Sequence, residues 1–187
     1  IHVGRVQDAV DLAKNMIELP RHPKYNNLEN RGSSYYGRLR LFQVLRTFEL
    51  WDLLIELSDT PYLDATDTLK EQVKRSGFLG TAYFHKGEYE SGDKQLSLLD
   101  SLLEEQQKKR DRAVEEAEEK SQTEIEKAEE KPSKEEQEKS IKQAREKAAQ
   151  KSEQNIDTIE KAILSLEGYR QLLGKDPEEG IALLRKA

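Results

Sequence analysis

The sequence predicts an all-α protein in which helical hairpins stack into a solenoid and one long charged hairpin is inserted among them. Three observations support this expectation. Apolar residues recur at the spacing of amphipathic helices towards both ends of the chain. Small and apolar residues recur at the start of the second helix in each successive hairpin. Between the two ends, residues 104–153 contain 16 acidic and 13 basic side chains.

Two helices are predicted in the first part of the chain. Residues 5–19 place their apolar side chains on one stripe, and Pro20 ends this helix. The next helix is capped by Ser33 or Ser34 and carries aromatic and leucine residues at helical intervals. The polar loop between them is longer than a repeat turn requires. It is either a binding loop or a cover in which Tyr25 and Leu28 pack over the end of the first hairpin.

Three further helix starts follow. One helix lies within residues 50–63 and stops before Pro61. Another runs from about Thr68 to Lys86, where Gly87 breaks it. A new helix begins near Glu90, so residues 68–100 are predicted to form a helical hairpin.

The second helix of each predicted hairpin repeats one pattern. It begins with a small or apolar residue, and apolar or small residues follow four and seven positions later. The starting residues are Ala9, Leu53, Gly92 and Gly180, at spacings of 44, 39 and 88 residues. A helical hairpin that recurs at such a period is typical of a solenoid.

Part of this pattern resembles a known family. The stretch "LGTAY" (Leu79 to Tyr83) with the following "GEYESG" resembles a tetratricopeptide repeat, and "KDPEEGIALLRKA" at the end of the chain is similar to the second half of another. The resemblance implies an array of hairpins whose first helices line a groove. The chain departs from the family pattern at Ser76, where Trp is preferred, and at Gly92 and Gly180, where Ala is preferred.

The region from Arg31 to Asp67 is also similar to repeat regions of large bacterial proteins that carry a thioredoxin-like (redoxin) domain. Solenoid ends normally carry a polar cap, and "IALLRKA" lacks one. We therefore expect residues 1–187 to form a single repeat domain within a longer, multidomain protein.

The charged segment is predicted to be a helical arm spanning residues 101–163. Its two helices, at about 101–131 and 133–163, would each be about 45 Å long. Ser133 and Glu136 form a capping-box pattern for the return helix. Stripes at helical spacing favour an antiparallel coiled coil that is apolar at its base and frays near Lys131; they comprise Leu99, Leu103, Gln106, Arg110, Ala113 and Ala117, and Ile141, Ala144, Ala148, Ser152, Ile156, Ile159, Ile163 and Leu166. The arm either contacts a partner or second subunit, or is a solvated spacer.

The composition argues against several classes of protein. A net charge of −6 disfavours a nucleic-acid binder, which needs a basic face. The absence of cysteine excludes disulfides and thiolate metal sites. No apolar run approaches the roughly 18 residues of a membrane span. The sequence does not distinguish a cytoplasmic localisation from export from a bacterial cell.

No pattern for catalysis, a cofactor or a metal is present, so we expect this segment not to be an enzyme. His2, His22 and His85 lie far apart and none belongs to a metal-binding frame. His85 is interpreted as a residue of the repeat surface. The many glutamates lie on exposed helix faces, where burial cannot raise their pKa as general-acid chemistry requires.

The tetratricopeptide resemblance implies a candidate peptide groove. When the groove positions of the repeat family are transferred to the corresponding positions of this chain, the groove comprises Tyr35, Arg38, Phe42, Arg46, Lys74, Thr81, Phe84, His85 and Tyr169. Basic groups beside aromatic rings suit an extended peptide that carries a carboxylate. The alternatives are a solvated inner face and a face covered by another domain. For the helix that follows Ser33 a further alternative has the aromatic side chains in the core and the arginines on the outer face.

These observations predict a non-catalytic scaffold without cofactors that binds a protein, a peptide or an adjacent domain of the same chain through the groove or the arm. The competing prediction is a structural spacer within a larger, redoxin-type protein. A third possibility is self-association through the arm.

Overall fold

The computed structural model describes residues 4–28, 32–127 and 133–187. The elements within these ranges are helices and no strand is found there, so the all-α prediction is confirmed for the described residues. The helices are α1 (Val6–Glu18), α2 (Ser33–Thr47), α3 (Trp51–Ser58), α4 (Leu69–His85), α5 (Tyr89–Lys127), α6 (Lys134–Leu172) and α7 (Pro177–Lys186). His2 and the predicted fraying near Lys131 lie outside the described residues.

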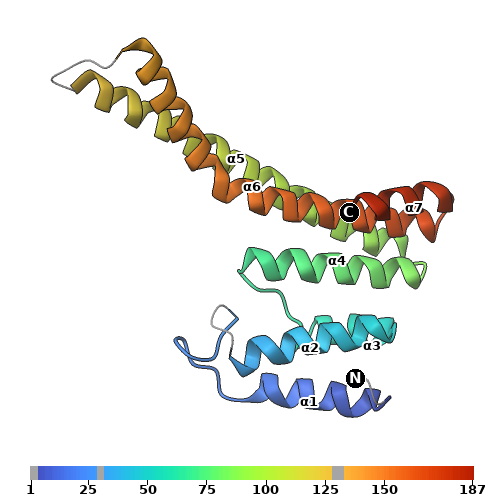
Figure 1. The fold of residues 1–187 in the computed structure, drawn as a ribbon. Helices are drawn as coiled ribbons and strands as arrows, with labels where there is room; N and C mark the ends of the chain where they lie inside the picture. The colour runs from blue at the N-terminus through green and yellow to red at the C-terminus, as the bar shows by residue number, and fades with distance from the viewer. Residues whose placement is uncertain (1–3, 29–31, 128–132) are drawn as a thin grey trace.

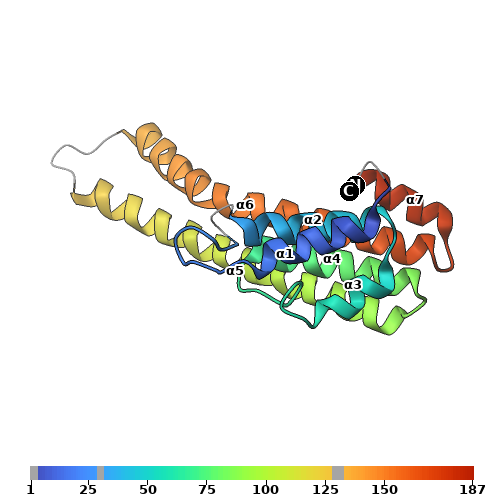
Figure 2. The same cartoon turned by 90° about the horizontal axis from the view of Figure 1, so that it is seen from below.

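The helices lie in successive layers, which Figure 1 shows from α1 at one end to α7 at the other. α1 packs on α2, α3 on α4, α4 on both α5 and α6, and α7 on α6. The long helices α5 and α6 run side by side and extend beyond the other helices in both views (Figures 1 and 2). The part of α5 and α6 that extends beyond the other helices, within the predicted residues 101–163, is called the arm below.

Local sequence explains several helix ends. Gly87, with a φ of 74°, follows the last turn of α4, where a left-handed residue commonly ends a helix. Ser133 and Glu136 form the predicted capping box at the start of α6. Asp176 caps α7 by accepting a hydrogen bond from the amide of Glu179, and Pro177 supplies the preset φ of a first helical residue.

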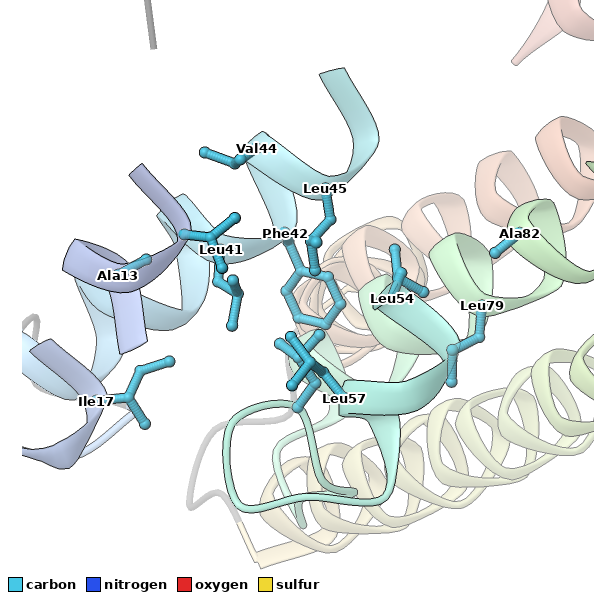
Figure 3. Close-up of a cluster of buried hydrophobic side chains, with 12 residues drawn as sticks. Ala13, Ile17, Leu41, Phe42, Val44, Leu45, Leu54, Leu57, Leu79 and Ala82 are labelled. Carbon is cyan, nitrogen blue, oxygen red and sulfur yellow. The ribbon is translucent and has the colours of Figure 1, made fainter. Parts of the chain in front are cut away.

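Two clusters of buried apolar side chains hold the layers together. The first joins α1, α2, α3 and α4, and Figure 3 shows Phe42 and Leu45 of α2 close to Leu54 and Leu57 of α3. The second joins α4, α5 and α6 through Val73, Phe84, Leu99, Ile159 and Leu166. Each fully buried leucine or phenylalanine contributes about 1.5–3 kcal/mol of hydrophobic stabilisation relative to the exposed side chain. Neither cluster, among the described residues, includes any residue between 104 and 155.

The facing sides of α5 and α6 carry the predicted stripes. All fourteen stripe residues are buried or half-buried. Beyond the apolar base the contacts become polar: Asn155 Nδ2 donates to Gln106 Oε1 at 3.2 Å, and the hydroxyls of Ser121 and Ser140 lie 3.4 Å apart. Both pairs fit one antiparallel register. The two helices run through residues 101 and 163 without a break, so the arm is continuous with the helices of the body.

The loop between α1 and α2 does not use Tyr25 as a cover, because Tyr25 is 66% exposed. Asn26 organises the loop instead. Its side-chain oxygen accepts a hydrogen bond from the amide of Ser34 at 2.8 Å, and its side-chain nitrogen donates to the carbonyl of Pro20 at 2.8 Å. The amide thus satisfies backbone groups at the end of one helix and the start of the next.

Candidate functional site

A hollow of about 300 Å³ lies beside α4, between the α2–α3 junction and α6. Its size is at the lower end of the range typical of ligand-binding clefts. The described residues that line it are Arg46, Trp51, Lys70, Val73, Lys74, Gly77, Phe78, Thr81, Thr158, Ala162, Ser165, Leu166 and Tyr169. These residues come from four helices, because one face of α4 is covered on one side by the α2–α3 junction and on the other by α6. Their spacing along α4 is that of a single helix face.

Aromatic side chains form one end of the hollow. The Trp51 ring stacks on the His85 imidazole, with centroids 4.6 Å apart and an interplanar angle of 17°. The Tyr169 ring approaches the same imidazole at 5.8 Å and 51°. Trp51 and Tyr169 line the hollow, and His85 lies against both of them. The three rings therefore connect α3, α4 and α6 at this wall.

Three basic side chains, Arg46, Lys70 and Lys74, line the hollow, and no acidic side chain is among its described lining residues. Arg46 lies over the Phe78 ring, 5.3 Å from its centroid. Lys74 lies 5.4 Å from the centroid of the Phe42 ring and pairs with Glu71. Because the whole chain has a net charge of −6, this concentration of positive charge is local.

Four of the nine predicted groove residues line the hollow: Arg46, Lys74, Thr81 and Tyr169. His85 contacts two of the lining rings from the side. Tyr35 is half-buried near the start of α2 and is not brought to the hollow.

The groove prediction is wrong for the other three residues, Arg38, Phe42 and Phe84, because each is at most 2% exposed. Phe42 and Phe84 belong to the two apolar clusters, so they hold helices together and do not face a groove. Arg38 does not face solvent either, so the alternative that places the arginines of this helix on an outer face is wrong for Arg38, whereas Arg40 and Arg46 are exposed.

The guanidinium of Arg38 is enclosed by acceptors from two later parts of the chain. Its Nε donates to Glu71 Oε2 at 3.1 Å, and one terminal nitrogen donates to Asp64 Oδ1 at 3.1 Å and to the Tyr62 carbonyl at 3.2 Å. The other terminal nitrogen donates to the Asp64 carbonyl at 2.5 Å. Four of the five N–H donors of Arg38 are therefore occupied within the fold, and the residue is 2% exposed, so it is not available to a peptide from solution. Its role is to join α2 to the α3–α4 loop and α4.

Nine of the thirteen described lining residues were not predicted for the groove, and they include the aromatic and basic side chains Trp51, Lys70 and Phe78. Lys70, Lys74, Phe78 and Thr81 follow the helical spacing along one face of α4, and this spacing was a signal that could have found Lys70 and Phe78. Trp51 is the first residue of α3, and no periodic pattern brings it to a hollow that α6 also lines.

His85 differs in its charge from the basic residues of the site. Burial lowers the pKa of His85 from its ordinary value of 6.5, and the nearby carboxylate of Glu49 partly opposes this shift. Its neighbour Lys86 pairs with Asp52 of α3 at 2.7 Å. The hollow is therefore positive through Arg46, Lys70 and Lys74, with a neutral imidazole beside it near pH 7.

Residues 4–28, 32–127 and 133–187 form neither a metal site nor a membrane span. No group of three or more metal-ligating side chains is gathered there. None of the helices in these ranges combines the length and the apolar character of a membrane span.

The fold and the hollow define an all-α protein with a basic, aromatic-walled depression beside its fourth helix. Comparison of the chain with models of protein families, with curated proteins and with solved structures found no match.

Proposed function

We propose that this chain is a non-catalytic interaction scaffold that binds an acidic segment of another protein, or of a neighbouring domain, in the hollow beside α4. The observation that carries the proposal is the lining of the hollow. It combines three basic side chains with the rings of Trp51, Phe78 and Tyr169 and, among its described residues, contains no carboxylate.

The chemistry of the hollow fits a peptide better than a small polar molecule. Its volume of about 300 Å³ accommodates one or two side chains, and its open form leaves room for a backbone to cross it. The aromatic walls would bury an apolar side chain of the ligand. Arg46 and Lys70 would then bind flanking carboxylates through charge-assisted hydrogen bonds.

We propose a tetratricopeptide-like arrangement for helices α4 to α7. In it α4 and the start of α5 form one hairpin, and the end of α6 and α7 form the next. Gly92 and Gly180 occupy equivalent positions, and a Cβ atom at either would overlap with Phe84 or with the Leu172 backbone. The first helices of the two hairpins, α4 and α6, are the two long walls of the hollow, which is where such arrays bind peptides.

The arm supports a second candidate function, a spacer or docking element within a larger protein. In this proposal the distal parts of α5 and α6 form an antiparallel coiled coil. Its seam contains the Gln106–Asn155 and Ser121–Ser140 pairs, and its outer faces carry ion pairs such as Glu104–Lys108 and Glu105–Lys109. Such pairs favour helicity by only about 0.2–0.5 kcal/mol each. A solvated spacer that holds other domains apart needs no more than this.

A peptide-binding experiment tests the first proposal. Three short labelled peptides would share the same leucine and phenylalanine positions and differ only in having acidic, neutral or basic residues between them. Binding to the full chain would be measured by fluorescence anisotropy and by the emission of Trp51, the single tryptophan. We expect saturable binding of the acidic peptide, together with a change in Trp51 emission.

Charge reversal supplies the control. Arg46→Glu and Lys70→Glu should each weaken binding of the acidic peptide about ten-fold or more, because a carboxylate then faces a carboxylate. Arg40→Glu is the matched control, since Arg40 is an exposed arginine of α2 that lies outside the hollow. If no peptide binds, or if all three variants bind alike, the hollow is not the binding site.

A further inference from the structure

His85 occupies a position from which it can influence the hollow without lining it. It lies in the last turn of α4, and its ring contacts Trp51 of α3 and Tyr169 of α6. Both of these rings line the hollow. A change in the charge of this imidazole is therefore transmitted to the wall that a bound segment would touch.

We propose that His85 is a proton-controlled switch of the hollow, and that its protonation tightens binding of an acidic segment. This inference rests on the function proposed above, because it concerns the regulation of the same site. The neutral imidazole stacks on the Trp51 ring and contacts the tilted ring of Tyr169. The imidazolium would add one more positive charge beside Arg46, Lys70 and Lys74.

The charged groups around His85 allow this switch to operate. On its own helix, Lys86 is already paired with Asp52 of α3. From the α2–α3 connection, Glu49 favours the protonated imidazole, while burial disfavours it and lowers its pKa overall. From α6 the facing group is the Tyr169 phenol. The last turn of α2 contributes Arg46, which lines the same hollow. His85 is therefore predicted to be neutral at pH 7.5 and to charge on the acid side of 6.5.

The stacked geometry also determines what the ligand does to the switch. An imidazolium beside an indole face gains a cation–π interaction, so protonation need not break the stack. A bound carboxylate would stabilise the imidazolium further. By reciprocity, if protonation of His85 tightens the acidic peptide, the peptide must raise the pKa of His85 by the corresponding amount.

The first experiment needs no ligand. Emission of Trp51 in the full chain would be followed from about pH 8 to about pH 5, the range in which histidine titrates. We expect one inflection below 6.5. His85→Phe keeps an aromatic ring in the stack but cannot bind a proton, and His85→Gln repeats the test without a ring. Both should lose the inflection. His22→Phe is the matched control, because His22 is an exposed histidine in the α1–α2 loop, and it should keep the inflection.

The second experiment measures affinity for the acidic labelled peptide at about pH 7.5 and about pH 5.5, between which peptide carboxylates stay ionised. The unmodified chain should bind more tightly at the lower pH, by at most about three-fold, which is the effect of one full unit charge about 7 Å away in water. The peptide should also move the Trp51 inflection to higher pH. The His85 variants should show neither effect.

The outcomes separate the two proposals. If no peptide binds at either pH, the proposed function fails and this inference fails with it. If the peptide binds in the hollow but the pH dependence is absent, or is unchanged in His85→Phe and His85→Gln, the switch is overturned while the binding function stands.

Discussion

The guanidinium of Arg38 carries a positive charge into the contact between α2 and α4, where its side chain is 2% exposed and that of Glu71 is 5% exposed. A charge at such a place is tolerated only when it is paired and its hydrogen-bonding groups are satisfied. Arg38 meets this condition through Glu71, Asp64 and two backbone carbonyls. Each of these groups would lose this partner if the side chain were shortened, and Glu71 would keep its pairing with Lys74.

Arg38→Leu is therefore expected to lower the free energy of unfolding by about 3 kcal/mol, because Glu71 keeps its charge in a buried place and loses a partner. The pairing of Glu71 with Lys74 would limit the loss. Urea denaturation followed by circular dichroism measures this change. Arg40→Leu is the control on the same helix, and as an exposed site it should change stability by no more than about 0.5 kcal/mol. Equal effects for the two variants would contradict the assignment of Arg38 to a buried network.

The lowered pKa of His85 has a consequence for stability that can be measured without any ligand. The unfolded chain has the ordinary pKa of 6.5, and the folded chain has a lower one because of burial. Between these values the unfolded state binds more protons, so the free energy of unfolding falls as the pH falls. The contribution is complete above 6.5 and is lost progressively below it.

We expect the free energy of unfolding to fall from pH 7.5 to pH 5.5 by more in the unmodified chain than in His85→Phe, a comparison in which titration of the carboxylates is common to both. Urea midpoints at a series of pH values give this difference. A decline that is equally steep in His85→Phe would mean that His85 has the same pKa in the folded and unfolded states.

At the residue scale, sequence spacing identified side chains that share a helix face but not those that meet across the fold. Lys74 and Thr81 belong to the hollow as predicted, because both lie on the same face of α4. Arg38 was assigned to the groove by offset from the tetratricopeptide pattern. Its partners Asp64 and Glu71 follow 26 and 33 residues later. No local pattern indicates that such distant carboxylates turn back to one arginine.

At the scale of single elements, glycines mark where two helices approach most closely. Gly180 of α7 lies against the backbone of α6 at Leu172 and Gly168, where a Cβ atom would overlap with main-chain atoms. Gly77 of α4 is the opposite case, since no described atom lies within 4 Å of a Cβ built there. The two glycines therefore separate the effect of close packing from the effect of glycine on a helix.

Gly180→Ala is expected to destabilise the protein by about 1–2 kcal/mol, because separating α6 and α7 costs more than the gain in helix propensity. Gly77→Ala should instead stabilise it by about 0.5–1 kcal/mol through that propensity alone. Thermal or urea unfolding of both variants makes the comparison. If Gly180→Ala were as stabilising as Gly77→Ala, the close approach of α7 to α6 would be wrong.

The periodic patterns predicted the ends of the body helices better than they predicted the bounds of the arm. The helix expected within residues 5–19 is found at Val6–Glu18, and the one expected from Thr68 to Lys86 is found at Leu69–His85. Proline and glycine mark these ends in the sequence. The arm boundaries at 101 and 163 have no counterpart in the structure, because nothing in the sequence breaks the helices there and both continue into the body.

At the scale of the whole molecule, the chain has a body and an arm. Two apolar clusters hold the body together, whereas the two helices of the arm contact each other through the polar pairs Gln106–Asn155 and Ser121–Ser140. The prediction of an inserted charged arm rests on the coincidence of the charged residues with the 88-residue spacing. The sequence could not predict which body helices the arm would continue, nor that α4 would contact α6, since that contact depends on where the chain returns after the arm. Gly80 of α4, against which Leu166 of α6 packs closely, is part of that contact.

The body should therefore fold and bind without the distal arm. In the register set by Gln106–Asn155 and Ser121–Ser140, Ala113 of α5 lies level with Ala148 of α6. A variant that joins these two residues by a short glycine-rich turn, in place of residues 114–147, removes the distal arm and keeps both apolar clusters. Its circular dichroism should show less helix, while its urea midpoint should stay close to that of the full chain because the removed segment contributes little buried apolar area.

The same variant separates the two proposed functions. If the hollow binds the acidic peptide, the shortened chain should bind it with unchanged affinity and should keep the loss of binding caused by Arg46→Glu. If the arm is the contact surface, shortening it should abolish binding while the midpoint of unfolding is unchanged. Unfolding of the body on removal of residues 114–147 would contradict the division itself, because the distal arm would then contribute to stability despite lying outside both apolar clusters.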